Sequence, residues 1–287
     1  MIVKAEGVSF TYGIGTPFVK TAVDDISVGF ERGEFVGIIG HTGSGKSTFI
    51  RMLNGLEKPQ SGKVFFDGED IWENKDKIRQ LRFNVGLVFQ YPEYQLFEET
   101  VFEDIAYGPK NMGLDEEEIK NRVNMAMEFV GVSKHFEKSS PFELSGGQKR
   151  RVAIAGIIAM KPQVLVLDEP TAGLDPQGRE DIFKRIKEYH RSSGSTVIFV
   201  SHSMEDVARA AHRVVVMNHG KIAMDDKTEN IFKRVDELME MGLDVPQVTR
   251  VFNELKRRGI VIEEGIYTVG FAAELISKRI LGGGGAV

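Results

Sequence analysis

The hydrophobic pattern separates stretches that favour strands from stretches that favour helices. Residues 2–13 alternate between apolar and polar positions, whereas the stretch VLVLDEP at 164–170 begins with four consecutive apolar residues, as in a strand buried on both faces. Further strands are predicted at 24–30, 34–40, 63–68, 84–90 and 196–202, with a hairpin at 214–225. Helices are predicted at 46–55, 178–194 and 205–213. Strands and helices therefore alternate along most of the chain.

A mainly helical stretch, residues 94–160, interrupts this alternation. Within it, Ile119, Val123, Met127 and Val130 recur at the spacing of one buried helix face. The strands and helices on either side predict an α/β fold whose parallel-sheet core carries a helical insertion. Beyond about Glu229 the pattern predicts a small helical extension with one strand at 261–270. The glycine-rich end, 282–287, is expected to be disordered.

Composition and charge exclude several kinds of chemistry. The 287 residues are 41% hydrophobic and 28% charged, which is ordinary for a globular protein. The absence of cysteine excludes disulfides, thiol catalysis and thiolate metal sites. A formal net charge of −5 argues against nucleic acid as the main partner. Because the sequence shows neither a membrane span nor a signal-peptide pattern, we expect a soluble intracellular protein that reaches any membrane through a partner.

The most specific motif is GHTGSGKS at 40–47, which matches the phosphate-binding pattern GxxxxGK[ST] at every fixed position. It follows an apolar strand and opens a helix, as the chemistry requires. Glycines at 40, 43 and 45 let the backbone turn tightly, so that consecutive N–H groups point at a phosphate. The alternative is a glycine-rich turn that only caps a helix.

Three side chains of this motif have distinct expected roles. Lys46 is predicted to bridge the β- and γ-phosphate oxygens, and Ser47 to hold Mg²⁺. His41 occupies a variable position of the motif and is not expected to be catalytic. The motif therefore predicts a nucleotide site that contains magnesium.

A second group of candidates stands at the ends of later strands. Asp168 and Glu169 follow a buried strand, where open α/β sheets place their ligands. Asp168 suits the Mg²⁺ shell, and Glu169 is placed to orient or deprotonate the attacking water. His202 is predicted to contact the γ-phosphate or Glu169, and Gln90 ends its strand in the same way. Alternatively, Asp168 and Glu169 could be a loop cap and a surface charge. His202 could be a structural or merely exposed histidine.

A second candidate for anion binding lies in FELSGGQKRR, residues 142–151. Gly146 and Gly147 open a helix predicted at 148–159, whose free N–H groups suit an anion. Three basic residues, 149–151, crowd its first turn, where each cation opposes the macrodipole by about 0.3–1 kcal/mol. A bound polyphosphate would offset that cost, and a solvated basic turn is the alternative.

Taken together, these motifs resemble those of ATP-binding cassette (ABC) ATPases. The phosphate loop, Gln90, LSGGQ, LDEP, AGLDP and His202 stand in the order of that family, over residues 1 to about 228. The resemblance implies an α/β P-loop NTPase fold of ABC type. Its parts would be a parallel-sheet core, an antiparallel N-terminal β subdomain, a helical subdomain at about 94–160 and a C-terminal extension at 229–287.

The resemblance implies ATP and Mg²⁺ as ligands, and a dimer in which LSGGQ of one subunit covers the γ-phosphate bound by the other. Tyr12 is similar to the aromatic residue that stacks on adenine, and Asp175 to the acidic residue that communicates across the dimer. The implied ATP-binding residues are Tyr12, Gly40, His41, Thr42, Gly43, Ser44, Gly45, Lys46, Ser47 and Thr48. The implied signature residues are Leu144, Ser145, Gly146, Gly147 and Gln148. The implied catalytic residues are Gln90, Glu169 and His202, and the implied Mg²⁺ ligands are Ser47, Gln90 and Asp168.

A narrower resemblance is to the ATPases of energy-coupling factor transporters, which import vitamins and cobalt or nickel ions. It rests on residues 89–113 and on 15–27, which is similar to the second of two paired ATPase types. The segment 229–287 is similar to an extension that helps to join the two ATPases.

This narrower resemblance implies three partners: a second ATPase (a paralogue or another copy), a membrane coupling protein and a membrane protein that captures the substrate. The chain would then be peripheral, at the cytoplasmic face of the membrane. The candidate contacts with the membrane partner are Tyr91, Tyr94, Leu96 and Phe97, unless these side chains belong to the core.

Other functions would fit part of the pattern. The chain could serve a different ABC transporter, or act as a soluble cassette ATPase on nucleic acid or ribosomes. The second class typically has two cassettes or a long coiled-coil insertion, whereas this chain has one cassette with about a hundred residues between the phosphate loop and LSGGQ. A scaffold without ATPase activity is disfavoured because every residue expected for hydrolysis is present. We therefore expect no nucleic-acid partner.

Overall fold

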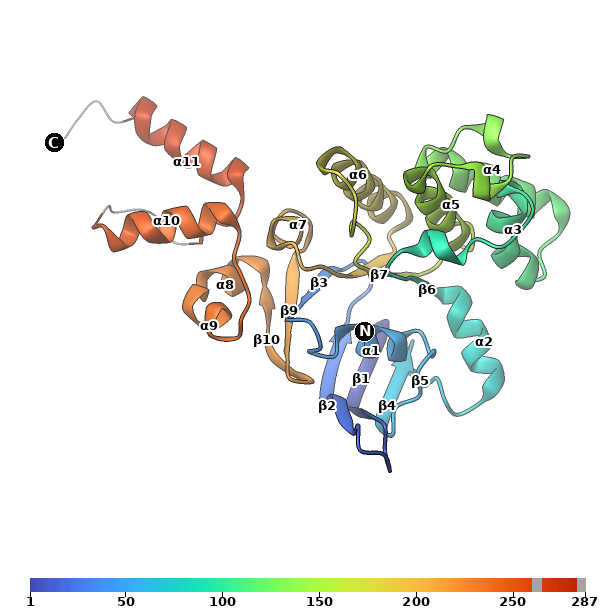
Figure 1. The fold of residues 1–287 in the computed structure, drawn as a ribbon, viewed down its shortest axis with the longest axis horizontal. Helices are drawn as coiled ribbons and strands as arrows, with labels where there is room; N and C mark the ends of the chain where they lie inside the picture. The colour runs from blue at the N-terminus through green and yellow to red at the C-terminus, as the bar shows by residue number, and fades with distance from the viewer. Residues whose placement is uncertain (260–264, 283–287) are drawn as a thin grey trace.

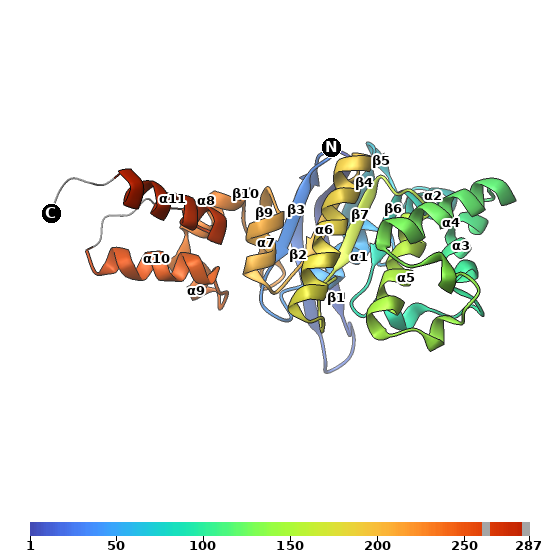
Figure 2. The ribbon, with the colours of Figure 1, turned by 90° about the horizontal axis from the view of Figure 1, so that it is seen from above.

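The computed structural model describes residues 1–259 and 265–282, which form two sheets with helices between and around them (Figures 1 and 2). The core sheet has six strands in the order β10–β9–β3–β8–β7–β6. They are β3 (Phe35–Ile39), β6 (Val85–Val88), β7 (Val164–Asp168), β8 (Thr196–Val200), β9 (Arg213–Asn218) and β10 (Lys221–Lys227). The neighbouring pairs are parallel, except that β10 at the edge runs antiparallel to β9. The prediction of a parallel-sheet core is confirmed.

The N-terminal sheet is antiparallel and has the order β2–β1–β4–β5. Its strands are β1 (Val3–Tyr12), β2 (Lys20–Phe30), β4 (Ser61–Phe66) and β5 (Glu69–Asp70). Helix α1 (Lys46–Leu53) lies between this sheet and the core sheet (Figure 1). Phe49 and Ile50 of α1 are fully buried in one apolar cluster with Val36 and Ile38 of β3. Burial of side chains of this kind contributes about 1.5–3 kcal/mol each and holds the phosphate loop in place.

The opposite face of the core sheet is covered by α6 (Pro176–Ser193) and α7 (Met204–Ala210) (Figure 2). Phe35 and Ile39 of β3 face this side and join a second apolar cluster that includes Phe183 of α6. Successive residues of a strand point to opposite faces, which explains why β3 is buried along its whole length. Helix α7 ends earlier than the predicted 205–213, because Arg213 already belongs to β9.

The helical subdomain lies at the right-hand end of the molecule in Figure 1. After α2 (Lys75–Asn84) and β6, it comprises η1 (Pro92–Gln95), α3 (Val101–Asn111), α4 (Glu116–Val130), η2 (Lys134–Phe136), η3 (Pro141–Glu143) and α5 (Gly146–Ile158). The predicted face of α4 is confirmed, since Ile119, Val123, Met127 and Val130 are all buried. Helix α2 was not predicted. Five of its ten residues are charged and only three are apolar, too few to show an apolar stripe from which a helix could be recognised.

The C-terminal extension lies at the other end of the molecule, beyond β10 (Figures 1 and 2). It contains α8 (Thr228–Lys233), α9 (Val235–Glu240), α10 (Gln247–Arg257) and α11 (Val269–Gly282). Ile231 and Phe232 of α8 are fully buried in the same apolar cluster as Phe35 of β3, so the extension is packed directly onto the core. The strand expected at 261–270 lies partly outside the described residues; its described part is irregular at 265–268 and then enters α11. Residues 283–287, expected to be disordered, also lie outside the described residues.

No helix within residues 1–259 and 265–282 is both long enough and apolar enough to cross a bilayer.

Candidate functional site

The phosphate loop, residues 40–47, joins the end of β3 to α1. Gly40 has no room for a side chain, because a Cβ there would lie 2.4 Å from the carbonyl oxygen of Met217. Gly45 has a φ of 101°, which favours glycine, and its Cβ would lie 1.9 Å from the carbonyl oxygen of Ala22. No side chain caps α1 at Gly45, so the first N–H groups of this helix are open to an anion.

Lys46 lies inside this loop and is only 5% exposed. Its ammonium group donates to the carbonyl oxygens of Gly40 (2.7 Å) and His41 (3.0 Å). Burial lowers the pKa of Lys46, while the carboxylates of Glu169 and Asp168 act in the opposite direction. The ammonium is thus held by neutral carbonyls, and phosphate oxygens would be stronger partners for it.

The hydroxyl groups of Ser47 and Ser44, also in the loop, have different surroundings. Ser47 Oγ donates to Asp168 Oδ1 at 3.3 Å. Burial raises the pKa of Asp168, the hydrogen bond from Ser47 opposes that shift, and the neighbouring Glu169 adds to it. Ser44 Oγ is fully buried and has no hydrogen-bond partner in the described part of the chain. An unpartnered buried hydroxyl costs about 1–3 kcal/mol, a cost that a bound ligand could remove.

Glu169 is held between two other predicted residues at the carboxyl ends of adjacent strands. His202 Nε2 lies 2.8 Å from Glu169 Oε1, and Gln90 Nε2 donates to Glu169 Oε2 at 3.3 Å. Glu169 has a φ of 50°, a conformation that non-glycine residues adopt at a cost of about 1–3 kcal/mol and that is concentrated at functional sites. These three side chains come from the ends of β6, β7 and β8, which lie side by side because the sheet is parallel here.

Tyr12 lies beside the loop and His41 lies within it, and each has hydrogen-bond partners of its own. Tyr12 Oη is 3.1 Å from Thr48 Oγ1, and the ring is 39% exposed. His41 Nδ1 lies 2.9 Å from the carbonyl oxygen of Thr42, and Nε2 lies 3.1 Å from Asn218 Oδ1 at the end of β9. His41 therefore ties the loop to the end of β9.

The signature segment, residues 144–148, begins α5 two residues earlier than predicted. Ser145 caps the helix through a hydrogen bond from Gln148 N, and Gln148 Oε1 accepts from Ser145 N in return, which completes a capping box. A Cβ at Gly146 or Gly147 would meet nothing within 4 Å, so packing within this chain does not require either glycine. Both glycines leave the N-terminus of α5 open to a ligand or another chain.

Arg150 contradicts the interpretation of 149–151 as a basic turn open to phosphate or solvent. Its side chain is 3% exposed and forms two hydrogen bonds of 3.0 Å with the Glu93 carboxylate. It also donates to the carbonyl oxygens of Pro170 (3.4 Å) and Ala172 (2.6 Å). Arg150 thereby connects α5 to η1 and to the loop after Glu169. Sequence reasoning missed this contact because no local signal pairs residues 57 positions apart.

Replacement of Arg150 by Met should lower the free energy of unfolding by about 3 kcal/mol, because it leaves the Glu93 carboxylate buried without its partner. Lys149→Ala is the matched control on the same helical turn, and it should change stability by less than about 0.5 kcal/mol. Urea denaturation of both variants measures the difference. A loss below about 1 kcal/mol for Arg150→Met would show that the ion pair contributes little.

Asp175 caps α6, since its carboxylate accepts from Gly178 N at 2.7 Å. This contact gives Asp175 a structural role within the chain. Its predicted role in communication across a dimer stays a prediction.

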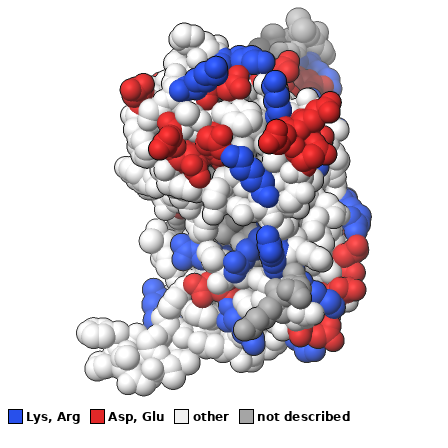
Figure 3. Space-filling model, turned by 90° about the vertical axis from the view of Figure 1, so that its right-hand side faces the viewer, with Lys and Arg blue, Asp and Glu red and all other residues white. Residues whose placement is uncertain are grey.

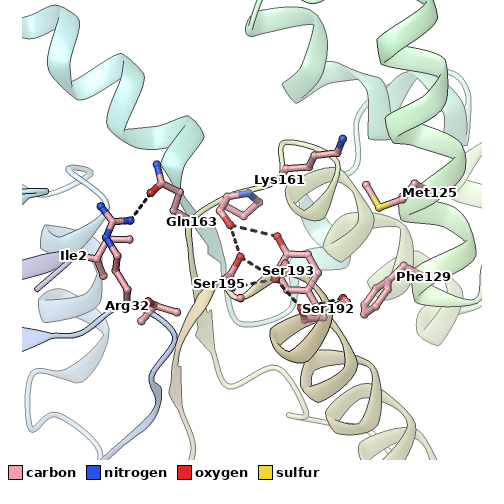
Figure 4. A pocket seen from close by; sticks show the side chains of 13 residues that line it. Ile2, Arg32, Met125, Phe129, Lys161, Gln163, Ser192, Ser193 and Ser195 are labelled. Atoms are coloured by element: carbon pink, nitrogen blue, oxygen red, sulfur yellow. Dashed lines mark hydrogen bonds between the residues drawn. The ribbon is translucent and has the colours of Figure 1, made fainter.

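A pocket of about 520 Å³ lies at the opposite ends of the parallel strands, where β7 and β8 begin (Figure 4). Its polar side chains bond within the chain: Ser195 Oγ donates to the carbonyl oxygen of Pro162 at 2.7 Å, and Arg32 Nη1 donates to Gln163 Oε1 at 2.8 Å. Because these groups already have partners, this pocket does not compete with the phosphate loop as the candidate site.

Comparison with known proteins agrees with this site. Residues 23–172 match the family model described as ABC transporter. The chain is 56% identical to the energy-coupling factor transporter ATP-binding protein EcfA2 of Clostridium perfringens, over 98% of this chain and 99% of that protein. It is 54% identical to the EcfA2 protein of Caldanaerobacter subterraneus subsp. tengcongensis, with the same coverage of 98% and 99%. The chain belongs to the EcfA2 family of ABC transporter ATPases.

Solved structures place this EcfA2-family chain among ABC cassettes. The cbiO1 protein of Clostridium perfringens, part of the ABC transporter complex cbiONQ, superposes with a TM-score of 0.74 at 37% identity, over 88% of this chain and 98% of that one. A dimeric ATP-binding cassette in a post-hydrolysis state, bound to ADP and Pi, gives a TM-score of 0.71 at 29% identity, over 79% and 98%. The predicted ABC fold is confirmed.

EcfA2-family membership also confirms the predicted activity. The chain is an ATPase subunit of the energy-coupling factor type, in which ATP hydrolysis is coupled to transport. The prediction of a nucleotide-binding protein is confirmed at the level of the family. The roles of individual residues in this EcfA2-family chain stay predictions, which the contacts described above support.

Proposed function

We propose that this chain binds ATP and Mg²⁺ on the phosphate loop and hydrolyses ATP with Glu169 as the general base. The observation that carries the proposal is the contact of Glu169 with His202 (2.8 Å) and Gln90 (3.3 Å). A carboxylate whose two oxygens both have hydrogen-bond partners keeps one orientation. A general base needs such a fixed orientation to accept a proton from a water molecule. His202 and Gln90 are then positioned to contact that water or the γ-phosphate.

In the proposed site, Lys46 and the N–H groups at the start of α1 bind the phosphates, and Tyr12 stacks on adenine. Ser47 and Asp168 offer the oxygen ligands that Mg²⁺ prefers, with Gln90 as a further candidate. Within the described ranges no group of three or more His, Cys, Asp or Glu could hold a metal alone, which suits a site shared with phosphate and water. Mg²⁺, when bound, would neutralise phosphate charge.

A second ATPase chain, either a paralogue or another copy, is proposed to complete the site. Its signature segment would place the N-terminus of an α5 helix over the γ-phosphate, and Asp175 would lie near the contact. The open glycines 146 and 147 support this arrangement. We also propose that 1–228 is the nucleotide-binding domain and that 229–287 helps to join the two ATPases. Exposed apolar side chains on the extension, such as Val251 and Phe271, support the second role.

A groove of about 340 Å³ between η1, α3 and α5 is the proposed contact with a membrane coupling protein. Its rim carries Phe97 and Tyr107, which are 57% and 49% exposed and whose rings meet edge to face at 4.9 Å. Leu96 also lines the groove, but it is only 7% exposed and belongs to the apolar core as well. Because the groove lies next to the segment after Gln90, movement at the nucleotide site could reach the partner.

Through this partner and a membrane protein that captures the substrate, the chain is proposed to power uptake of a vitamin or a transition-metal ion. It would lie peripherally at the cytoplasmic face of the membrane. On the face in Figure 3, Lys and Arg side chains are interspersed with Asp and Glu rather than gathered into a basic stripe. This mixed surface supports a protein partner over nucleic acid.

The double substitution of Phe97 and Tyr107 by Ser should weaken assembly with the membrane partner by about 30-fold, because loss of two aromatic contacts of about 1 kcal/mol each gives an effect of this size. Copurification with the coupling protein, followed by uptake in reconstituted vesicles, measures the effect. Leu56→Ser, at a 44% exposed apolar position outside the groove, is the control. Unchanged assembly and uptake in the double variant would remove the groove from the contact.

A further inference from the structure

Lys20 is the one charged residue between Glu6 and Asp24. It begins β2, where the antiparallel ladder pairs it with Tyr12 of β1. Side chains of residues paired in this way lie on the same face of the sheet. Because Tyr12 Oη lies 3.1 Å from Thr48 Oγ1, this face of the hairpin is the one turned toward the start of α1.

The side chain of Lys20 reaches the phosphate loop itself. Its Nζ lies 3.2 Å from the point that a Cβ of Gly43 would occupy, and Gly43 has a φ of +82°. Lys20 is exposed, and no hydrogen bond or ion pair joins its ammonium to any described residue. A free ammonium group therefore stands at the outer side of the loop, while the ammonium of Lys46 is enclosed within it.

The placement of this second cation is unfavourable in the protein alone. The N-terminus of α1 carries the positive end of the helix dipole, and Lys46 already adds a charge there. The nearby carboxylates of Asp168 and Glu169 are engaged by other groups, namely Ser47, Gln90 and His202. A cation at a helix N-terminus is unfavourable unless it has an anionic partner. Where the protein supplies none, we expect an anionic ligand to offset the cost.

We infer that Lys20 is a second phosphate-binding lysine, which contacts the β- and γ-phosphates of ATP from the outer side of the loop. The inference rests on the proposed function, because it places the nucleotide on residues 40–47. The flexible stem and compact charge of a lysine suit contact with a polyphosphate from one side. Lys20 would also connect nucleotide binding to the hairpin between β1 and β2, since the same strand pair carries Tyr12.

Equilibrium binding of ATP, ADP and AMP to the full chain, with Mg²⁺ at low and high salt, tests this role. Lys20→Ala should weaken ATP binding by about 10-fold and Lys20→Glu by more, because a charge-assisted contact is lost or reversed. Lys20→Arg should stay within about two-fold of the native protein. AMP lacks the β- and γ-phosphates, so its affinity should change less than two-fold in every variant. Lys120→Ala, an exposed lysine on α4, is the matched control.

The outcomes separate this inference from the proposed function. If the Lys20 variants bind ATP like the native protein while Lys46→Ala loses binding, the inference is wrong and the nucleotide site stands. If Lys46→Ala also binds normally, the site itself is misplaced and both fail. If ATP affinity is unchanged but ATP-dependent association is lost, Lys20 acts on the partner chain, which again overturns a phosphate contact. Thermal melting of each variant confirms folding.

Discussion

Glu169→Gln should bind ATP with nearly native affinity but hydrolyse it at least about 100-fold more slowly. The amide keeps the size of the carboxylate, and it can still meet Gln90 and His202, but it cannot accept a proton from water. General base catalysis contributes about 10²–10⁴-fold to enzymatic rates, which sets the expected loss. Steady-state phosphate release and equilibrium binding of a fluorescent ATP analogue, measured on the same preparation, give both quantities.

A suitable control is Glu180→Gln, an exposed glutamate on α6 that pairs with Arg209, which should leave turnover unchanged. Turnover by Glu169→Gln within about two-fold of the native rate would remove Glu169 from the role of base.

The solution mass of the same variant tests whether the chain forms a dimer with another copy of itself. A doubling of its solution mass with ATP and Mg²⁺ would show that one chain supplies both halves of the site. A monomer that still binds ATP would mean that the facing signature belongs to a paralogue.

Lys46→Ala should raise the dissociation constant for ATP by about 100-fold. The ammonium is buried in the loop and is held there by the carbonyl oxygens of Gly40 and His41. Hydrogen bonds to charged groups contribute about 1.5–3 kcal/mol each and about 1.4 kcal/mol is tenfold in affinity, so 100-fold is the lower bound for loss of two phosphate contacts. Isothermal titration of the variant with ATP in the presence of Mg²⁺ is the direct measurement.

Because the alanine side chain leaves those carbonyls without a donor, folding of the Lys46 variant must be checked by circular dichroism and thermal melting. A folded Lys46→Ala protein with native ATP affinity would refute the assignment of the phosphate cradle. Lys46→Arg tests whether the positive charge alone is sufficient. Arginine keeps the charge, but it is too large for a site in which the native lysine is only 5% exposed. We expect Lys46→Arg to bind ATP poorly as well.

Local features of the fold were predictable because residues close in sequence determine them. The continuous apolar strands, the glycines of the phosphate loop and the buried face of α4 each follow from backbone geometry or side-chain period. Helix α2 could not be predicted because half of its residues are charged and only three are apolar, so that its sequence shows no helical period. Helix α5 begins two residues before its predicted start, because Ser145 and Gln148 form a capping box that brings Gly146 and Gly147 into the helix.

The sequence by itself determined the family, the order of the nucleotide motifs and which residue types stand at each strand end. Only the tertiary structure decided which of these groups meet: Ser47 with Asp168 across 121 positions, and Arg150 with Glu93 across 57. It also showed that Arg150 is buried in an ion pair and that Lys20 reaches Gly43. Motifs reflect local chemistry. Contacts between distant segments arise instead from the packing of α1 between two sheets and of α5 against the loop after Glu169, which no local pattern encodes.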